Sequence, residues 1–176
     1  MEIKFCSQCG ETMRWRSPEG DNRNRFICDK CNFIHYQNPN IVAGCIVYKE
    51  DSVLLCKRAI EPRAGLWTLP AGFMENGETT RHAAERETFE ETGARISAEE
   101  LFAITNSPHA NHVNIFYLAK LKDSRFHPTS ESSEVQLFKK SDIPLDNIAF
   151  HTVKVVLELF FRDVERGNFS LHEIDF

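Results

Sequence analysis

The stretch GFMENGETTRHAAERETFEETGA, residues 72–94, carries the strongest structural signal in the chain. Its second half has the composition of a helix, and Gly93 follows where a helix C-terminus favours glycine. Glu87 lies three residues before Glu90 and four before Glu91, so the three carboxylates share about 100° of the helix surface. Like charges at these spacings destabilise a helix by a few tenths of a kcal/mol per pair. Such a cluster suits a hard divalent cation, which prefers oxygen ligands.

A loop directly before this helix completes a candidate metal cradle. Leu69–Phe73 ends a short strand at Pro70 and can expose backbone carbonyl groups, and Glu75–Glu78 then curls into the helix. A diphosphate needs its charge neutralised, and Mg²⁺ does this while it generates a nucleophilic water. The stretch therefore predicts a metal-dependent site for a diphosphate compound. The alternative interpretation is a solvated acidic helix face.

The spacing of these residues resembles the Nudix box of the Nudix hydrolases. This sequence matches all the fixed positions of the box: Gly72, Glu78, Arg86, Glu87, Glu90, Glu91 and Gly93. Thr88 occupies a variable position in which an aliphatic residue is usual, which is a mild departure in packing. The resemblance covers about residues 39–165 of the chain.

The resemblance implies a fold and a reaction. The fold would be a Nudix α/β/α sandwich with a mixed sheet. The reaction would be the hydrolysis of a nucleoside diphosphate linked to another group, with Mg²⁺ or Mn²⁺ as the catalytic metal. By resemblance, Glu87, Glu90 and Glu91 would hold the metal ions, together with the backbone carbonyl of Ala71.

The family also implies roles for residues around the metal. Arg86 would orient the carboxylates by pairing with Glu78. Glu90 would position or deprotonate the attacking water. Some family members instead take this base from a distal loop, and Glu131 and Glu134 are the candidates for it here. For these two residues, plain solvation of a loop is the alternative interpretation.

The expected substrate follows from short features of the resemblance. Ala71–Gly72, in place of a double glycine, resembles enzymes that act on ADP-ribose and dinucleotides. NADH pyrophosphatases carry a Ser-Gln-Pro-Trp-Pro-Phe-Pro-x-Ser array after the box, and residues 105–112 (TNSPHANH) do not match it. We therefore expect FAD or ADP-ribose to be preferred over NADH, with release of AMP. The candidate substrate-binding residues are Arg58, Arg63, Phe73 and Glu75.

Four cysteines near the start of the chain form a second signal. Cys6 and Cys9 make one Cys-x-x-Cys pair and Cys28 and Cys31 make another, the spacing of a tetrahedral zinc site. Four thiolates leave no open position, so the zinc would be structural. Two disulfides or a redox pair are the alternatives, and a cytosolic chain disfavours structural disulfides. Zinc ribbons also occur in Nudix proteins among the NADH and the FAD or ADP-ribose pyrophosphatases.

Hydrophobic patterning predicts an α+β layered sandwich with a small domain in front of it. Residues 1–38 would form a zinc-ribbon β-hairpin, and residues 39–176 would form the Nudix hydrolase domain. Cys45 and Cys56 lie in apolar strand-like runs and are expected to be core residues. In the second domain, strands are expected over residues 41–48, 53–56, 67–69, 101–105, 113–121 and 135–138, with helices over 79–92 and from Thr152 to Gly167.

Composition limits the class of protein and its partners. The chain has 176 residues, of which 41% are hydrophobic and 27% charged, values typical of a soluble globular protein. It contains no run of about 18 apolar residues and no apolar signal region, so we expect a cytoplasmic protein that does not span a membrane. The net charge of −5 argues against general attraction to nucleic acid.

Two classes of function remain open from the sequence. The first is a metal-dependent enzyme that acts on a small-molecule nucleotide and forms a homodimer. The second is a nucleotide- or RNA-binding module, in which the arginines and aromatic side chains of the ribbon grip the ligand without turnover. The complete acidic box favours the enzyme, because a pure binder has no need for three aligned carboxylates.

Overall fold

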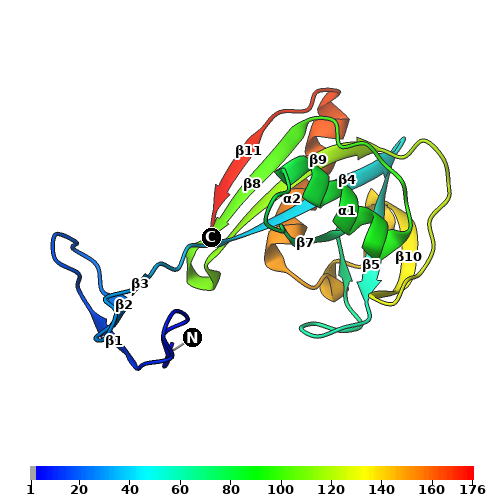
Figure 1. Ribbon diagram of the computed structural model, residues 1–176. Coiled ribbons are helices and arrows are strands. Elements are labelled where there is room, and N and C mark those ends of the chain that lie inside the picture. Colours follow the sequence, from blue (N-terminus) through cyan, green and yellow to red (C-terminus); the bar gives the residue numbers. More distant parts are fainter. Residues whose placement is uncertain (1–2) are drawn as a thin grey trace. The chain divides into compact units, whose positions relative to one another are not determined.

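The computed structural model describes residues 3–176, which divide into two compact units, one up to Asn38 and one from Pro39 onward (Figure 1). The first unit holds a three-stranded antiparallel sheet in the order β1–β2–β3. Its strands are β1 (Met13–Arg16), β2 (Arg25–Cys28) and β3 (Ile34–His35). The hairpin matches the sequence prediction. The short strand β3 adds a third strand to this hairpin, and its His35 pairs with Phe26 of β2.

The first unit has very little hydrophobic core. Its buried apolar residues are Cys6, Ile27 and Cys28, whereas Phe5 and Trp15 are 65% and 60% exposed. A segment this short does not bury enough apolar surface to fold by packing alone. Its stability must therefore come largely from another source, and bound metal is the usual one for cysteine-rich units of this size.

The second unit is built on an eight-stranded mixed sheet. Its main path runs β10–β5–β4–β9–β8–β11, with β6 paired to β5 and β7 paired to β4. The β4–β9 and β8–β11 pairs are parallel and the others are antiparallel, so the expected mixed sheet is confirmed. The strands are β4 (Asn40–Lys49), β5 (Ser52–Arg58), β6 (Trp67–Thr68), β7 (Ala71–Phe73), β8 (Leu101–Ser107), β9 (His112–Lys120), β10 (Ser132–Lys139) and β11 (His172–Asp175).

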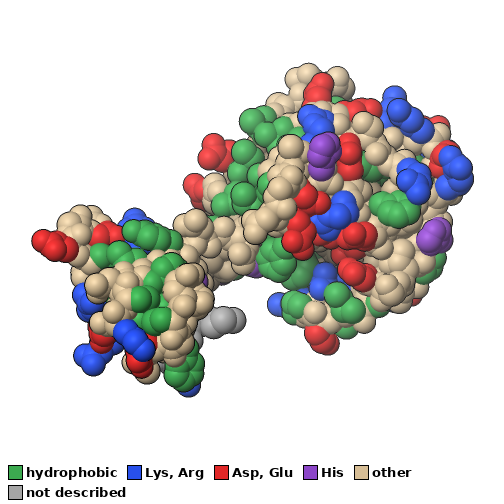
Figure 2. Space-filling model, in the orientation of Figure 1, with side chains coloured by type: hydrophobic (Ala, Val, Ile, Leu, Met, Phe, Trp, Pro, Cys, Tyr) green, Lys and Arg blue, Asp and Glu red, His purple; other side chains and the backbone are tan. Residues whose placement is uncertain are grey.

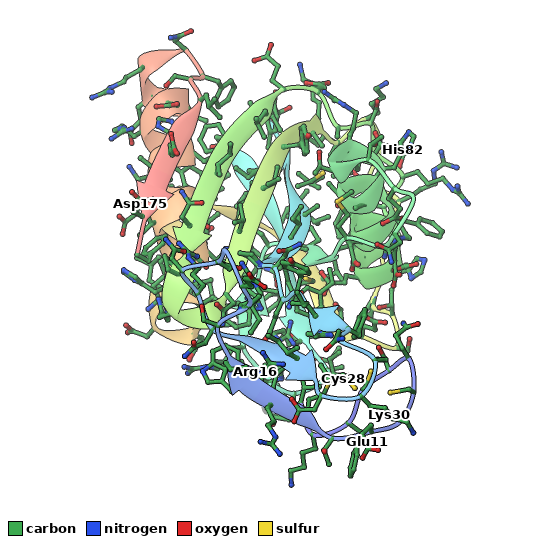
Figure 3. The ribbon with its side chains drawn as sticks, turned by 60° about the vertical axis from the view of Figure 1, so that its left-hand side comes forward. Glu11, Arg16, Cys28, Lys30, His82 and Asp175 are labelled. Atoms are coloured by element: carbon green, nitrogen blue, oxygen red, sulfur yellow. The ribbon has the colours of Figure 1, made fainter. Side chains whose placement is uncertain are left out.

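Two helices cover opposite faces of this sheet, which confirms the α/β/α sandwich (Figure 1). Residues of β4 alternate between the faces: Cys45 and Val47 pack in the cluster beneath α1, and Ile46 packs in the cluster beneath α2. In Figure 3, His82 marks α1 and Asp175 marks the strand at one edge of the sheet. The helices are α1 (Thr80–Thr92) and α2 (His151–Arg166), with short 3₁₀ turns at Pro108–Ala110, Lys140–Asp142 and Leu145–Asn147.

Both helices end at the glycines that the sequence predicts. The side chain of Thr79 caps α1 by accepting a hydrogen bond from the backbone N–H of His82 at 3.2 Å. Gly93 and Gly167 end the two helices in the left-handed region, with φ of 68° and 69°. Both helices therefore begin and end within one or two residues of the positions predicted.

Two strands of the second unit were absent from the sequence prediction. The strand β7 lies in the segment expected to be a loop, and β11 follows α2, where no element was expected. Both are short, at three and four residues, and too short to show a pattern of alternating polarity. No helix in residues 3–176 combines the length and hydropathy needed to cross a membrane.

Candidate active site

Two glycines allow the short strand β7 to lie tightly between β4 and α1. A Cβ atom on Gly44 of β4 would lie 2.4 Å from Cβ of Ala71, so only glycine permits this approach. A Cβ atom on Gly72 would lie 2.2 Å from Oε2 of Glu87 on α1. The absence of a side chain at position 72 therefore gives the Glu87 carboxylate its place against the backbone of β7.

Arg86 links three glutamates, one from the loop before α1 and two from α1 itself. Its Nε and Nη2 donate to the two carboxylate oxygens of Glu78 at 2.7 and 2.9 Å, a bidentate pair. Its Nη1 donates to Oε1 of Glu87 at 2.7 Å and to Oε2 of Glu90 at 2.9 Å. The hydrogen bonds from Arg86 hold the pKa of Glu78 at about 2. Glu78 therefore stays ionised and keeps the guanidinium group fixed.

Two glutamates of α1 are largely removed from water. Glu87 and Glu91 are 8% and 6% exposed. Burial raises the pKa of Glu91 to about 7, although the backbone N–H of Ala71 donates to its Oε2 at 2.9 Å and opposes the rise. Burial also raises the pKa of Glu87, against the influence of Arg86. Ionisation of either buried carboxylate costs desolvation free energy, and a cation bound in the cavity would offset that cost.

A cavity of about 680 Å³ opens beside these carboxylates, within the size range of small-molecule sites. Its lining includes five acidic residues: Glu61, Glu75, Glu87, Glu91 and Glu131. It also includes aromatic and histidine residues: Phe73, His109, His112, Phe116, Phe150, His151 and Phe176. Figure 2 shows acidic side chains gathered around a basic one on the face of the second unit where α1 lies in Figure 1.

The structure brings most of the sequence-predicted site residues to this cavity. Ala71, Arg58, Phe73 and Glu75 line it together with Glu87 and Glu91. Arg58 donates from Nε to the carbonyl of Pro62 at 2.8 Å, and its guanidinium carbon lies 5.4 Å from the ring centre of Phe150. The ring of Phe73 meets the ring of His112 edge to face, with centres 5.4 Å apart.

Other predicted residues lie outside the cavity wall. Arg63, Glu78 and Glu90 are not among the lining residues in the described part of the chain. Glu90 is held by Arg86, and its side chain is 47% exposed. Of the two distal candidates, Glu131 lines the cavity, whereas Glu134 pairs with Lys57 at 2.7 Å. The geometry thus separates Glu131 from Glu134, which the sequence treated alike.

Several lining residues were assigned no role from the sequence. His112 and Asn114 come from β9, Phe150 and His151 come from the start of α2, and Phe176 follows β11. They carry no local signal, because strand pairing and the packing of α2 bring distant segments together.

The donor set of the cavity fits a hard divalent cation. Glu87 and Glu91 offer carboxylate oxygens from one helix face, and oxygen ligands are those that Mg²⁺ and Mn²⁺ prefer. The acidic groups do not converge as tightly as the four cysteine sulfurs do within residues 3–176. The hydrogen bonds of Arg86 to Glu87 and Glu90 account for part of this spread.

The four predicted zinc ligands of the first unit come together. The Sγ atoms of Cys6, Cys9, Cys28 and Cys31 all lie within 4.8 Å of one another, with close pairs at 3.5–3.6 Å. Tetrahedral coordination with Zn–S bonds of about 2.3 Å needs sulfurs about 3.8 Å apart. The sulfurs at the end of β2, next to Cys28 in Figure 3, therefore fit zinc without rearrangement.

Comparison with known families and structures identifies both units. The family model described as "NUDIX domain" matches residues 38–159, and the one described as "Nudix N-terminal", a zinc ribbon, matches residues 4–37. A NUDIX hydrolase from Nitrosomonas europaea, known from a crystal structure, is 48% identical, with a TM-score of 0.93. The match covers 99% of this chain and 100% of that one.

Two curated relatives carry names that describe an activity. An NAD-capped RNA hydrolase from Vibrio parahaemolyticus is 30% identical over 145 residues, 81% of this chain and 53% of the relative. An ADP-ribose pyrophosphatase from Methanocaldococcus jannaschii is 28% identical over 125 residues, 69% of this chain and 73% of the relative. This chain therefore spans about half the length of the first relative and about three quarters of the second.

Proposed function

Because the chain belongs to the Nudix hydrolase family, we propose that it hydrolyses the pyrophosphate bond of an ADP-linked nucleotide and releases AMP. The observation that carries this proposal is the pair of buried carboxylates, Glu87 and Glu91, in the wall of one cavity. Buried charges of one sign are costly unless a cation compensates them. A divalent cation would supply that compensation, and the diphosphate that it binds would occupy the cavity beside it.

We assign the catalytic metal site to Glu87, Glu90, Glu91 and the carbonyl of Ala71, with Mg²⁺ or Mn²⁺ as the ion. When bound, such an ion neutralises phosphate charge and lowers the pKa of a bound water. Arg86 holds Glu87 and Glu90 in place through its hydrogen bonds, and Glu78 holds Arg86. The ribbon cysteines would hold one structural zinc ion.

In the proposed reaction a water oxygen forms a bond to one phosphorus atom. The bond between that phosphorus and the bridging oxygen breaks, and the bridging oxygen leaves on the second phosphate. The water loses a proton to a base. Glu131 fits this role better than Glu90, because it lines the cavity with Glu87 and Glu91 and makes no side-chain ion pair within residues 3–176.

The substrate class is ADP-linked, and the candidates are ADP-ribose, FAD and NADH. The relative named ADP-ribose pyrophosphatase supports the first. The aromatic side chains of the cavity lining can take a planar group linked to the second phosphate, which supports a dinucleotide. Arg58, Phe73 and Glu75 line the cavity, which supports them as the proposed substrate-binding residues. Arg63 is not among the lining residues and would have to reach the substrate from outside the cavity wall.

The test is a substrate panel with the purified chain in Mg²⁺ or Mn²⁺. ADP-ribose, FAD, NADH, NAD and diadenosine polyphosphates are incubated and the products resolved by chromatography. AMP should appear from ADP-ribose or FAD, and Glu91→Gln should lower the rate at least about a hundredfold. Glu158→Gln, on the exposed face of α2, is the matched control and should keep full activity. A fully active Glu91→Gln would overturn the metal-site assignment.

A second candidate substrate is RNA whose 5′ end carries NAD. The names of several relatives favour it, although this chain spans about half of their length. The negative net charge argues only against general attraction to nucleic acid and not against recognition of one RNA end. A short RNA with a 5′-NAD end tests it, because cleavage of the pyrophosphate leaves a 5′-monophosphate. A binding module without turnover would bind this RNA and leave its end intact.

The homodimer also remains a proposal, and light scattering on the purified protein tests it. The exposed aromatic side chains of the first unit, Phe5, Trp15 and Tyr36, are candidates for such a contact. A mass of one chain across the accessible concentration range would contradict the dimer.

A further inference from the structure

A row of buried polar groups adjoins Glu91, and its first member, Cys56, is not among the cavity-lining residues in the described part of the chain. Cys56 of β5 is fully buried, and its Sγ lies 3.7 Å from Oε2 of Glu91 and 3.6 Å from the carbonyl oxygen of Thr68. A thiol has a single proton and is a weak donor. At these distances that proton can reach either oxygen.

The next member of the row is Ser132 of β10. This residue is 1% exposed, and its Oγ is the one buried side-chain polar atom that has no hydrogen-bond partner in residues 3–176. In the β10–β5 pair Ser132 lies opposite Arg58, two residues along the chain from Cys56, and its hydroxyl acts to lower the pKa of the buried Cys56 thiol. A buried hydroxyl without a partner is costly, and a small rotation toward the sulfur would satisfy it.

The two oxygens of Glu91 have different surroundings. Oε2 receives the backbone N–H of Ala71 at 2.9 Å and lies next to the Cys56 thiol. Oε1 makes no hydrogen bond to any residue from 3 to 176, and Glu91 lines the cavity. One oxygen is therefore held by these contacts, and the other is left for a ligand.

We propose that Cys56 is a positioning residue for Glu91: the Ser132 hydroxyl donates to its sulfur, and the thiol donates to Oε2, so that Oε1 is presented to the catalytic metal. This inference rests on the proposed function, because it assumes that Glu91 is a metal ligand. Partners of this kind orient a ligating carboxylate, and their loss commonly weakens metal binding about tenfold or more.

Cysteine suits this position better than its common replacements. The surrounding core is apolar, and Cys56 packs there as a small hydrophobic side chain while still offering a proton. Alanine would leave Oε2 with the Ala71 N–H alone. Serine keeps a donor of nearly the same shape.

The test measures Mn²⁺ binding to the zinc-loaded full chain without nucleotide, from the loss of the free Mn²⁺ signal in electron paramagnetic resonance. Cys56→Ala should weaken binding about tenfold, and Cys56→Ser should restore most of the affinity. Ser132→Ala should weaken binding less than Cys56→Ala does. Cys45→Ala is the matched control, because Cys45 is equally buried on β4 and packs in the cluster beneath α1. It should bind Mn²⁺ as the parent chain does.

Equal Mn²⁺ affinity in Cys56→Ala and the parent chain would overturn the positioning role and leave the proposed function standing. Equal weakening by Cys56→Ala and Cys45→Ala would also overturn it, since the effect would then be general to the core. A parent chain that binds no Mn²⁺ would overturn the proposed function and this inference together. Thermal melting identifies any variant that fails to fold. If Cys56→Ala does not fold, the Mn²⁺ affinities of Ser132→Ala and Cys56→Ser decide between these outcomes.

Discussion

Single residues decide where the carboxylates of the second unit lie. Gly72 is a clear case, because the Glu87 carboxylate occupies the space that any side chain at position 72 would need. Arg86 then fixes that carboxylate from its other side through Nη1. A glycine and an arginine in this way set the positions of carboxylates in the proposed metal site.

Gly72→Ala tests the first of these contacts. The new Cβ would lie 2.2 Å from Oε2 of Glu87, so either the carboxylate or β7 must move. We expect Mn²⁺ affinity and turnover to fall together by about tenfold or more, as for other displaced ligands. Gly77→Ala is the control: its φ of 89° makes alanine strained, but no atom lies within 4 Å of the new Cβ. It should lose stability without losing Mn²⁺ affinity, and the reverse pattern would contradict the argument.

At the scale of elements, caps and buried polar contacts fix the ends of the two helices. Thr79 starts α1 with a side-chain cap. Asp163, in the last turn of α2, is 2% exposed and joins the helix to the segment that follows. Its Oδ2 accepts hydrogen bonds from Nε2 of His172 at 2.7 Å and from the backbone N–H of Ser170 at 3.1 Å. These contacts anchor β11 at the edge of the sheet.

Removing the cap of α1 should cost measurable stability. Thr79→Ala leaves the backbone N–H of His82 without its partner, and such losses cost about 1 kcal/mol. For a chain of this size the melting temperature should fall by about 2–4 °C. Thr79→Ser keeps the acceptor and should melt within about a degree of the parent. A larger fall for serine than for alanine would show that the methyl group, not the cap, matters here.

The anchor of β11 should depend on acid pH. Burial acts to raise the pKa of Asp163, but hydrogen bonds from His172 and Ser170 outweigh it and lower the pKa below its usual range. Arg162, 3.7 Å from Oδ1, acts in the same direction. A lowered carboxyl pKa stabilises the fold fully above the ordinary Asp pKa of about 3.9 and loses that stabilisation as pH falls through the lower, folded-state value.

Urea unfolding of Asp163→Asn at several pH values tests this anchor. Near pH 6 the substitution should cost about 2 kcal/mol, the range for a hydrogen bond to a charged group. The difference from the parent chain should shrink as the pH falls from about 5 to about 3. Glu165→Gln is the control, because Glu165 makes only an exposed pair with Lys140 and should cost under about 1 kcal/mol. If the difference in unfolding free energy between Asp163→Asn and the parent chain does not change with pH, the charge of the Asp163 carboxylate is not the source of the stabilisation.

At the scale of the whole chain, the two units depend on different sources of stability. The second unit has two hydrophobic clusters, one on each face of its sheet. The first unit has few buried apolar side chains and four converging sulfurs. Its folding free energy should therefore be largely the free energy of zinc binding.

Removal of zinc should unfold one unit and spare the other. After chelation, hydrogen exchange of peptides from residues 3–38 should become as fast as in an unfolded chain. Peptides from β4, β9 and α2 should keep their protection, because the second unit is held together by its hydrophobic clusters and not by the four zinc-ligand cysteines. The variant Cys28→Ser should show the same pattern without chelator, and Cys45→Ala should keep one zinc per chain. Protection of β1 and β2 in zinc-free protein would contradict metal-dependent folding.

Much of the fold and part of the site could be predicted from local sequence. The helix α1, the glycine that ends it and its three glutamates lie within one stretch, so composition and residue spacing along that stretch predict them. The four zinc-ligand candidates could also be predicted locally, because each Cys-x-x-Cys turn directs two sulfurs toward one point. The prediction missed β7 and β11, because a strand of three or four residues has no period and is defined only by its neighbour in the sheet.

The sequence by itself determined the family, the candidate metal ligands and the helix that carries three of them, because these depend on spacing along one segment. Only the tertiary structure decided which residues share the cavity. It separated Glu131 from Glu134, placed His112, Phe150 and Phe176 in the lining of one cavity, and set Cys56 beside Glu91. Those neighbours come from different strands and helices, and sheet register, which no local pattern encodes, brings them together.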